Sequence, residues 1–211
     1  DRGLISPGIF IPIFEKNGLI TEVDKYMWEA ACKQLRKWQD EGKKELYISV
    51  NISPKDFYFV DVYQTFVDLL QKYKIHPKNL KLEITESALM MDFERHCELI
   101  DKLRLLGFVV EMDDFGSAYS SLNMLDQVSV DIMKIDKTFL KNEVLQKNEC
   151  IILEHVVSMA DKMDIITVCE GVESKEQLNF LAEIGCNVIQ GYYVGKPMPR
   201  SEEHTSELQS P

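Results

Sequence analysis

The chain has few residues of the kinds that build zinc sites or disulfide frameworks. Its five cysteines are odd in number and scattered, and they form no C-x-x-C pair; none of its four histidines stands at metal-ligand spacing. Structural zinc sites and disulfide scaffolds both need such residues at fixed short spacings. We therefore predict reduced thiols in a cytoplasmic protein, and we expect any metal ion to be held by oxygen ligands.

Positive charge and long apolar runs are also scarce. The chain has 24 basic against 35 acidic residues, a formal net charge of −11. DNA, RNA and anionic membranes are bound through basic patches, so we expect none of these partners. No apolar run approaches the roughly 20 residues of a membrane span, and there is no signal-peptide pattern. No G-x-G-x-x-G follows an apolar run, so a dinucleotide-binding fold has little support.

What the chain does have is a regular alternation of apolar runs and amphipathic segments. Residues 3–21 are predicted to be a turn-rich entry without a complete strand. Strands are expected at 45–50, at 80–85, from 108–110 to the aspartate pair 113–114, at 131–135, at 165–169 and at 186–189, with helices between them. This order is typical of right-handed βαβ units and a parallel sheet.

Each predicted strand ends in a polar residue. These residues are Asn51, Glu83, Asp113, Lys134, Glu170 and Gln190. A doubly wound sheet gathers functional groups at one switch point, whereas a (β/α) barrel gathers them at the C-terminal ends of many strands. The pattern therefore favours a TIM-like α/β barrel.

The adjacent pair Asp113–Asp114 carries the strongest chemical signal. An acidic turn, a surface lysine or a polar strand end would each be unremarkable alone, but together they indicate one site. Carboxylate and amide oxygens suit Mg²⁺ or Mn²⁺, and two such ions can activate water and clamp a phosphoryl group. Lys134 could then stabilise developing negative charge, and Glu170 could act as a base or as an outer ligand.

Seven ordered segments resemble the EAL domain, the bacterial phosphodiesterase family that hydrolyses cyclic di-GMP in second-messenger signalling. They are ISPGIFIPIFE at 5–15, SVNIS at 49–53, LEITES at 82–87, DDFGSAYSSL at 113–122, KIDKTF at 134–139, EGVE at 170–173 and QGYYVGKP at 190–197. The resemblance implies a TIM-like barrel with one antiparallel strand, two Mg²⁺ or Mn²⁺ ions, a homodimer formed through the loop after Asp114, and an upstream sensory or cyclase domain.

The same resemblance assigns roles by position. It implies metal ligands at Asn51, Glu83, Asp113 and Asp114, catalytic roles for Lys134 and Glu170, and site supports at Glu86, Glu173, Gln190 and Asp136. Glu86 resembles the glutamate that tethers the loop after the aspartate pair.

The chain departs from the family pattern in two places. Ala118 stands where the loop usually has a second glycine, and a positive φ there would strain alanine. The E-A-L tripeptide lies upstream of the family's ISPGIFIP segment, so we expect the first strand and one ligand glutamate to be missing from this chain. Residues 200–211 resemble a translated sequencing adapter, and we assign the domain to residues 1–199.

Two other functions compete with hydrolysis. A catalytically inactive EAL-type receptor or interaction module would lose several motif residues, but only Ala118 departs within the matched span. A Mg²⁺ barrel of the enolase type would have no aspartate pair and no EGVE. We therefore rank the phosphodiesterase first.

The missing strand leads to a direct prediction for the 211-residue chain. A barrel closes by pairing its first strand with its last, so its loss leaves open edges, exposed apolar side chains and a weakened metal site. We expect the chain to be oligomeric or poorly soluble and to lack measurable cyclic di-GMP hydrolysis. A version extended upstream through the E-A-L strand is expected to be soluble and to hydrolyse cyclic di-GMP. Size-exclusion profiles and Mn²⁺ assays compare the two; a monodisperse, active short chain would contradict the prediction.

Overall fold

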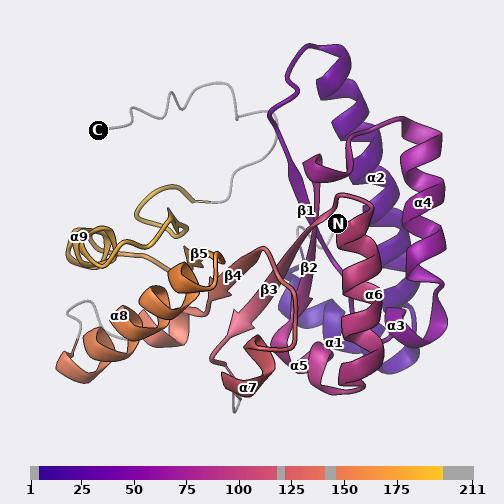
Figure 1. The fold of residues 1–211 in the computed structure, drawn as a ribbon. Helices are drawn as coiled ribbons and strands as arrows, with labels where there is room; N and C mark the ends of the chain where they lie inside the picture. Colours follow the sequence, from indigo (N-terminus) through magenta and orange to yellow (C-terminus); the bar gives the residue numbers. More distant parts are fainter. Residues whose placement is uncertain (1–4, 118–121, 141–145, 197–211) are drawn as a thin grey trace.

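Six strands form a single sheet in a computed structural model that describes residues 5–117, 122–140 and 146–196. Figure 1 shows the course of the chain through the sheet and its helices. Every neighbouring pair is parallel, and the strands follow one another in chain order. The strands are β1 (Ile48–Asn51), β2 (Leu80–Thr85), β3 (Val109–Phe115), β4 (Ile132–Ile135), β5 (Ile166–Cys169) and β6 (Val188–Ile189). A doubly wound sheet would reverse its order at a switch point, so this order confirms the barrel-like α/β class.

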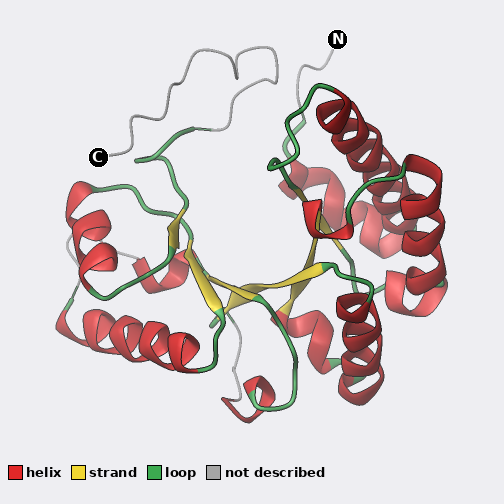
Figure 2. Cartoon of the chain, turned by 45° about the horizontal axis from the view of Figure 1, so that its top comes forward, coloured by secondary structure: helices red, strands yellow, loops and turns green. Residues whose placement is uncertain are grey.

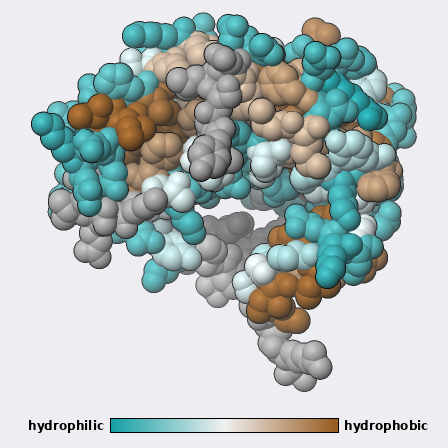
Figure 3. Space-filling view, turned by 90° about the horizontal axis from the view of Figure 1, so that it is seen from below, coloured by the Kyte–Doolittle hydropathy of each residue, from teal (hydrophilic) through white to brown (hydrophobic). Residues whose placement is uncertain are grey.

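The sheet curls into an arc with the helices on its convex side (Figure 2). The α-helices are α1 (Pro7–Asn17), α2 (Ile20–Asp40), α3 (Asp56–Phe59), α4 (Val62–Tyr73), α5 (Glu86–Met90), α6 (Phe93–Leu105), α7 (Leu122–Leu125), α8 (Lys147–Lys162) and α9 (Lys175–Glu183), and the 3₁₀ turns are η1 (Pro77–Asn79) and η2 (Lys137–Leu140). Among the described residues, β1 and β6 are each paired on one side only. The arc is therefore half of a barrel, and the space-filling view from below shows an opening at its centre (Figure 3).

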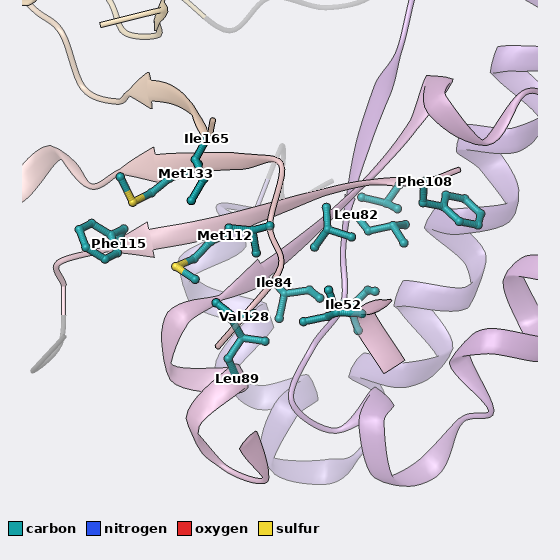
Figure 4. Packing of buried hydrophobic residues seen from close by; sticks show 14 of the residues in the cluster. Ile52, Leu82, Ile84, Leu89, Phe108, Met112, Phe115, Val128, Met133 and Ile165 are labelled. Carbon is teal, nitrogen blue, oxygen red and sulfur yellow. The ribbon is translucent and has the colours of Figure 1, made fainter. Parts of the chain in front are cut away.

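The two faces of the sheet differ because successive strand residues point to opposite sides. In β2, Leu80, Leu82 and Ile84 are buried, while the residues between them are only partly buried. Leu82 and Ile84 pack together with Met112 of β3 in the apolar core between sheet and helices (Figure 4). The concave face is left for Lys81 and Glu83, which line a cavity inside the arc.

The predicted turn-rich entry is wrong, because residues 7–17 form helix α1. Pro7 stands in the first helical turn, where a missing N–H costs nothing, and Gly18 ends the helix with a φ of 82°. Pro12 lies inside the helix. No residue of α1 is buried. The two prolines and two glycines of this stretch are residue types that are common in turns, so a prediction based on turn residues missed the helix.

Several smaller expectations have clear outcomes. The first strand begins at Ile48 rather than at residue 45, and the last is limited to Val188–Ile189. All five cysteines are free, as predicted. None of the described helices combines the length and the apolar content that a membrane crossing needs. Ala118 and the tail from residue 200 lie outside the described residues.

Gly191 provides a test of how tightly the last strand end is packed. A Cβ atom at this position would lie 2.2 Å from both the backbone N and the backbone O of Val172, whereas nothing lies within 4 Å of one at Gly195. We expect Gly191→Ala to lower the free energy of unfolding by about 1–3 kcal/mol, because backbone must move, and Gly195→Ala to leave it nearly unchanged. Urea denaturation measures both; equal effects would show that the contact is not tight.

Candidate metal and catalytic site

Lys134 is the centre of an ion-pair cluster at the C-terminal ends of the strands. Its Nζ lies 2.9 Å from Glu83 Oε1 of β2, 2.9 Å from Asp113 Oδ1 of β3 and 2.8 Å from Glu170 Oε1, which follows β5. The Lys134 side chain is 10% exposed, so these contacts are largely shielded from water. Three residues distant in the chain thus converge on one ammonium group, as the pattern of strand ends predicts.

A β-bulge brings both aspartates of the pair to the C-terminal ends of the strands, which we call the mouth of the arc. Met112 pairs with Met133 and Phe115 with Ile135, so β3 has one more residue than β4 across this interval. The extra residue restores the buried position of Phe115 after two consecutive partly buried aspartates. Asp114 has a φ of 56°, a left-handed conformation that aspartate tolerates better than most residues. Without the bulge, alternation would direct the second carboxylate into the apolar core.

The carboxylates of Asp113, Asp114 and Glu170 form a compact group. One oxygen from each lies within 4.8 Å of the others, which is close enough for a single metal ion to contact all three. Asp113 Oδ1 is buried, and the Lys134 ammonium lies 2.9 Å from it. A buried carboxylate oxygen in contact with an ammonium group lies where positive charge is favoured.

The electrostatic field at the mouth is strongly negative. Glu83, Asp113, Asp114 and Glu170 carry four carboxylates against the single charge of Lys134. Burial raises the pKa of Asp114, and the charges of Asp113, Asp136 and Glu170 raise it further. Burial also raises the pKa of Glu83, although Lys134 acts in the opposite direction. The ion pairs raise the pKa of Lys134 despite its burial, so this lysine stays protonated.

Glu86 contacts the loop that follows the aspartate pair. Its Oε2 accepts a hydrogen bond from the backbone N–H of Gly116 at 3.1 Å, and its side chain is buried. Gly116 has a φ of 89°, and a Cβ there would lie 2.1 Å from the ring of Phe139. The position therefore requires glycine on both grounds.

The remaining predicted residues lie around this cluster. Asn51 is exposed and pairs in register with Glu83, and its backbone oxygen accepts a hydrogen bond from Trp28. Gln190 is exposed and lines the cavity inside the arc with Glu83 and Lys134. Asp136 is buried and its Oδ1 accepts the Thr138 N–H at 2.8 Å.

Glu173 is exposed, and it is not part of the carboxylate group. Its backbone N–H donates to Gln177 Oε1 at 2.8 Å. The structure therefore places Glu173 at the start of α9 rather than in the cluster around Lys134.

A second ion pair inside the arc was not predicted. Lys81 Nζ lies 3.0 Å from Glu111 Oε1 and 3.7 Å from the centre of the Tyr47 ring. Both charged residues precede a site residue by two positions, so strand alternation places them on the same face as Glu83 and Asp113. Lys81 and Glu111 line the cavity inside the arc that Glu83 and Lys134 also line, and this cavity measures about 190 Å³. The two-residue spacing of this pair from Glu83 and Asp113 is the sequence signal that could have predicted it.

A cavity larger than the one inside the arc lies elsewhere. It measures about 860 Å³ and lies between α3, α4 and α6 on the outer layer, and none of the predicted site residues lines it. Its lining mixes aromatic side chains with charges of both signs, such as Arg95 and Glu98. The convergence of charged groups, and not cavity size, therefore identifies the candidate site.

Comparison with known proteins shows the family to which the chain belongs. The EAL domain family matches residues 1–197. The chain is 34% identical over 201 residues to the bifunctional diguanylate cyclase/cyclic di-GMP phosphodiesterase MucR of Pseudomonas aeruginosa, covering 95% of this chain and 29% of that protein. It is 33% identical over 198 residues to the cyclic di-GMP phosphodiesterase NbdA of the same organism, covering 94% of this chain and 25% of NbdA.

A solved structure shows the same fold. The PaMucR phosphodiesterase in complex with c-di-GMP superimposes with a TM-score of 0.90 at 33% identity, covering 96% of this chain and 82% of that one. The chain therefore spans most of the length of this solved structure but only about a quarter of the length of the two curated relatives.

The ion-pair cluster predicts that removing the Lys134 ammonium group strongly lowers the stability of the protein. Lys134→Met would leave three partly buried carboxylates without a counter-charge, and we expect a loss of about 3 kcal/mol in the free energy of unfolding, measured with excess chelator. Lys33→Met is the matched control, because its ammonium is 60% exposed and pairs with Glu29 at the surface, where we expect little change. Equal losses in urea denaturation would show that the cluster does not depend on Lys134.

Proposed function

Because the chain belongs to the EAL domain family, we propose that it is the catalytic part of a metal-dependent phosphodiesterase that hydrolyses cyclic di-GMP to the linear dinucleotide. The observation that carries the proposal is the convergence of Asp113, Asp114 and Glu170 with Lys134 at one mouth. The names of MucR and NbdA and the c-di-GMP held in the PaMucR structure support the choice of substrate.

The donor set fits Mg²⁺ or Mn²⁺. All candidate ligands are oxygens, and three carboxylates are within reach of one ion. We assign Asp113 and Asp114, with Glu83 and Asn51 beside them, to hold up to two ions. When bound, divalent cations lower the pKa of water and stabilise the negative charge of a phosphodiester undergoing displacement.

Lys134 and Glu170 take the roles that their contact suggests. The Lys134 ammonium stays protonated and can donate hydrogen bonds to an anionic oxygen at the reacting phosphorus. It also holds Glu170 Oε1 at 2.8 Å, which orients that carboxylate toward the aspartate pair. Glu170 is the group best placed to accept a proton from an attacking water.

The negative field of the mouth determines when substrate can bind. Four carboxylates repel a phosphodiester until cations neutralise them, so metal and substrate should bind in concert. We propose that Glu86, through Gly116, holds the loop next to Asp114, and that Gln190, Asp136 and Glu173 support the strand ends around it.

Wider properties of the protein remain proposals as well. The relatives are much longer than this chain, which is consistent with an upstream sensory or cyclase domain in a bacterial signalling protein. The predicted dimer through the loop after Asp114 also stays a prediction, because residues 118–121 lie outside the described part of the chain.

Hydrolysis by an upstream-extended version of the domain tests the proposal. We expect turnover of cyclic di-GMP with Mg²⁺ or Mn²⁺, inhibition by Ca²⁺, whose longer bonds and higher coordination number suit this site poorly, and none in excess chelator. Glu83→Gln, Asp113→Asn and Glu170→Gln should each reduce turnover at least a hundredfold, on the order found when one transition-state contact is removed.

The matched control is Glu98→Gln, an exposed carboxylate on α6, which should leave turnover unchanged. Binding of cyclic di-GMP without turnover would favour the inactive-receptor alternative. Full turnover in chelator would refute the metal site.

A further inference from the structure

Two buried carboxyl groups lie behind the turn that carries Asn51. Asp24 belongs to α2 and is 8% exposed, and Asp56, the first residue of α3, is fully buried. Neither has a basic partner among the described ion pairs. Neither belongs to the ion-pair cluster around Lys134. Buried acidic groups without a cation are rare, so this pair needs an explanation.

Asp56 holds the turn through one oxygen. Its Oδ2 accepts hydrogen bonds from the backbone N–H and the hydroxyl of Ser53, both at 2.8 Å, while its own N–H donates to the Ser53 carbonyl at 3.0 Å. Ser53 is two residues after Asn51. The conformation of the turn between β1 and α3 therefore depends on where the Asp56 carboxyl group lies.

The other oxygens of the pair lack a donor unless a proton joins them. Within the described residues, Asp24 Oδ2 and Asp56 Oδ1 are both buried and accept no hydrogen bond from any donor. The Asp24 carboxyl group is nevertheless within hydrogen-bonding contact of Asp56 and of Ser53. One proton on the pair turns an acceptor into a donor and satisfies both oxygens.

The charges around Asp24 favour that proton. Burial, the neighbouring charge of Asp56 and its hydrogen bond raise the pKa of Asp24 to about 7, and Glu15 of α1 adds a smaller repulsion. The Ser53 hydroxyl is the one contact that acts in the opposite direction. Two carboxyl groups this close cannot both ionise at low cost, as in other carboxyl pairs that share a proton.

Helix α2 contacts the same turn a second time. Trp28 lies one helical turn after Asp24 and is fully buried, and its indole Nε1–H donates to the backbone oxygen of Asn51 at 2.8 Å. Asn51 also stands next to Glu83, since the N–H of Ile52 donates to the Glu83 carbonyl at 2.8 Å. A shift of the turn would thus move Asn51 relative to the mouth.

We propose that Asp24 and Asp56 share one proton and that this carboxyl pair is the positioning element that holds the Asn51 turn in place at the mouth of the arc. Asp24 and Asp56 act through the turn and do not contact substrate. The consequence for metal binding rests on the proposed function, whereas the shared proton and the hold on the turn do not.

The proposal has a defined pH dependence. The pKa of Asp24 is higher in the folded chain than its ordinary value near 4, so the folded state binds more protons between these two values and stability falls as pH rises through about 7. Loss of the proton leaves two buried negative charges facing each other. The turn then loosens, and the bond from Trp28 to Asn51 weakens.

The Trp28 indole N–H signal in ¹H–¹⁵N spectra reports on that bond directly. This chain has two tryptophans, and Trp38 lies on the same helix far from the turn, so a Trp38→Phe variant assigns the signals and Trp38 serves as internal control. In the upstream-extended protein, we expect the Trp28 signal to move with a midpoint near pH 7 while Trp38 does not.

Three variants separate the shared proton from simple structural loss. Asp24→Asn supplies a permanent N–H donor to Asp56, so its Trp28 signal should be independent of pH. Asp24→Leu removes the donor and should weaken Mn²⁺ binding about tenfold. Asp24→Asn should keep the Mn²⁺ affinity close to that of the unmutated protein. Gln39→Leu removes another buried polar group from the far end of α2 and should retain both the titration and the Mn²⁺ affinity.

Each outcome bears on a separate part of the proposal. A Trp28 signal that does not change with pH in the unmutated protein, or an unchanged titration in Asp24→Asn, would overturn the shared proton. Normal Mn²⁺ affinity in Asp24→Leu would overturn the positioning role. Failure of the unmutated protein to bind Mn²⁺ would contradict the proposed function, while the indole titration would still decide whether the pair holds the turn.

Discussion

The repulsion between neighbouring carboxylates is the constraint on which the mouth of this molecule depends. Glu83 lies on β2, Asp113 on β3 and Glu170 directly after β5, and the Lys134 ammonium of β4 contacts all three within 3 Å. In a partly buried setting, removing one partner of such a contact costs far more than it does for a surface pair, because the other charge is left uncompensated. Other features near the mouth, among them the bulge in β3 and the Glu86 contact to Gly116, hold the groups that this lysine gathers.

Strand alternation explains how one sheet can carry both an apolar core and this charge. In β2, Leu80, Leu82 and Ile84 face the helices, and Lys81 and Glu83 between them face the cavity inside the arc. Farther along the sheet, apolar residues of β4, β5 and β6 also line that cavity. Charge on that face is arranged in two layers, with Lys81 and Glu111 in the lower one and Lys134 with its carboxylates in the upper one. The lower pair is neutral, whereas the upper layer has an excess of negative charge.

The sequence predicted the strands and their polar ends because both depend on local patterns. An apolar run followed by a polar residue is visible without knowing the fold, and parallel order then brings such ends together. It did not reveal the bulge, since nothing local distinguishes Asp113–Asp114 at a strand end from the same pair inside a bulged strand. Helix α1 was missed because its prolines and glycines are also turn residues. The Asp24–Asp56 pair was missed because it joins residues 32 positions apart through tertiary packing alone.

A crystal structure of the upstream-extended protein with Mn²⁺, using the anomalous signal of the metal, tests the central claim most directly. If the mouth is a metal-dependent phosphodiesterase site, Mn²⁺ should lie within coordination distance, about 2.2 Å, of oxygens from Asp113 and Asp114. It should be absent from an Asp113→Asn variant. Anomalous density that appears only elsewhere on the molecule would contradict the assignment of this carboxylate cluster as the metal site.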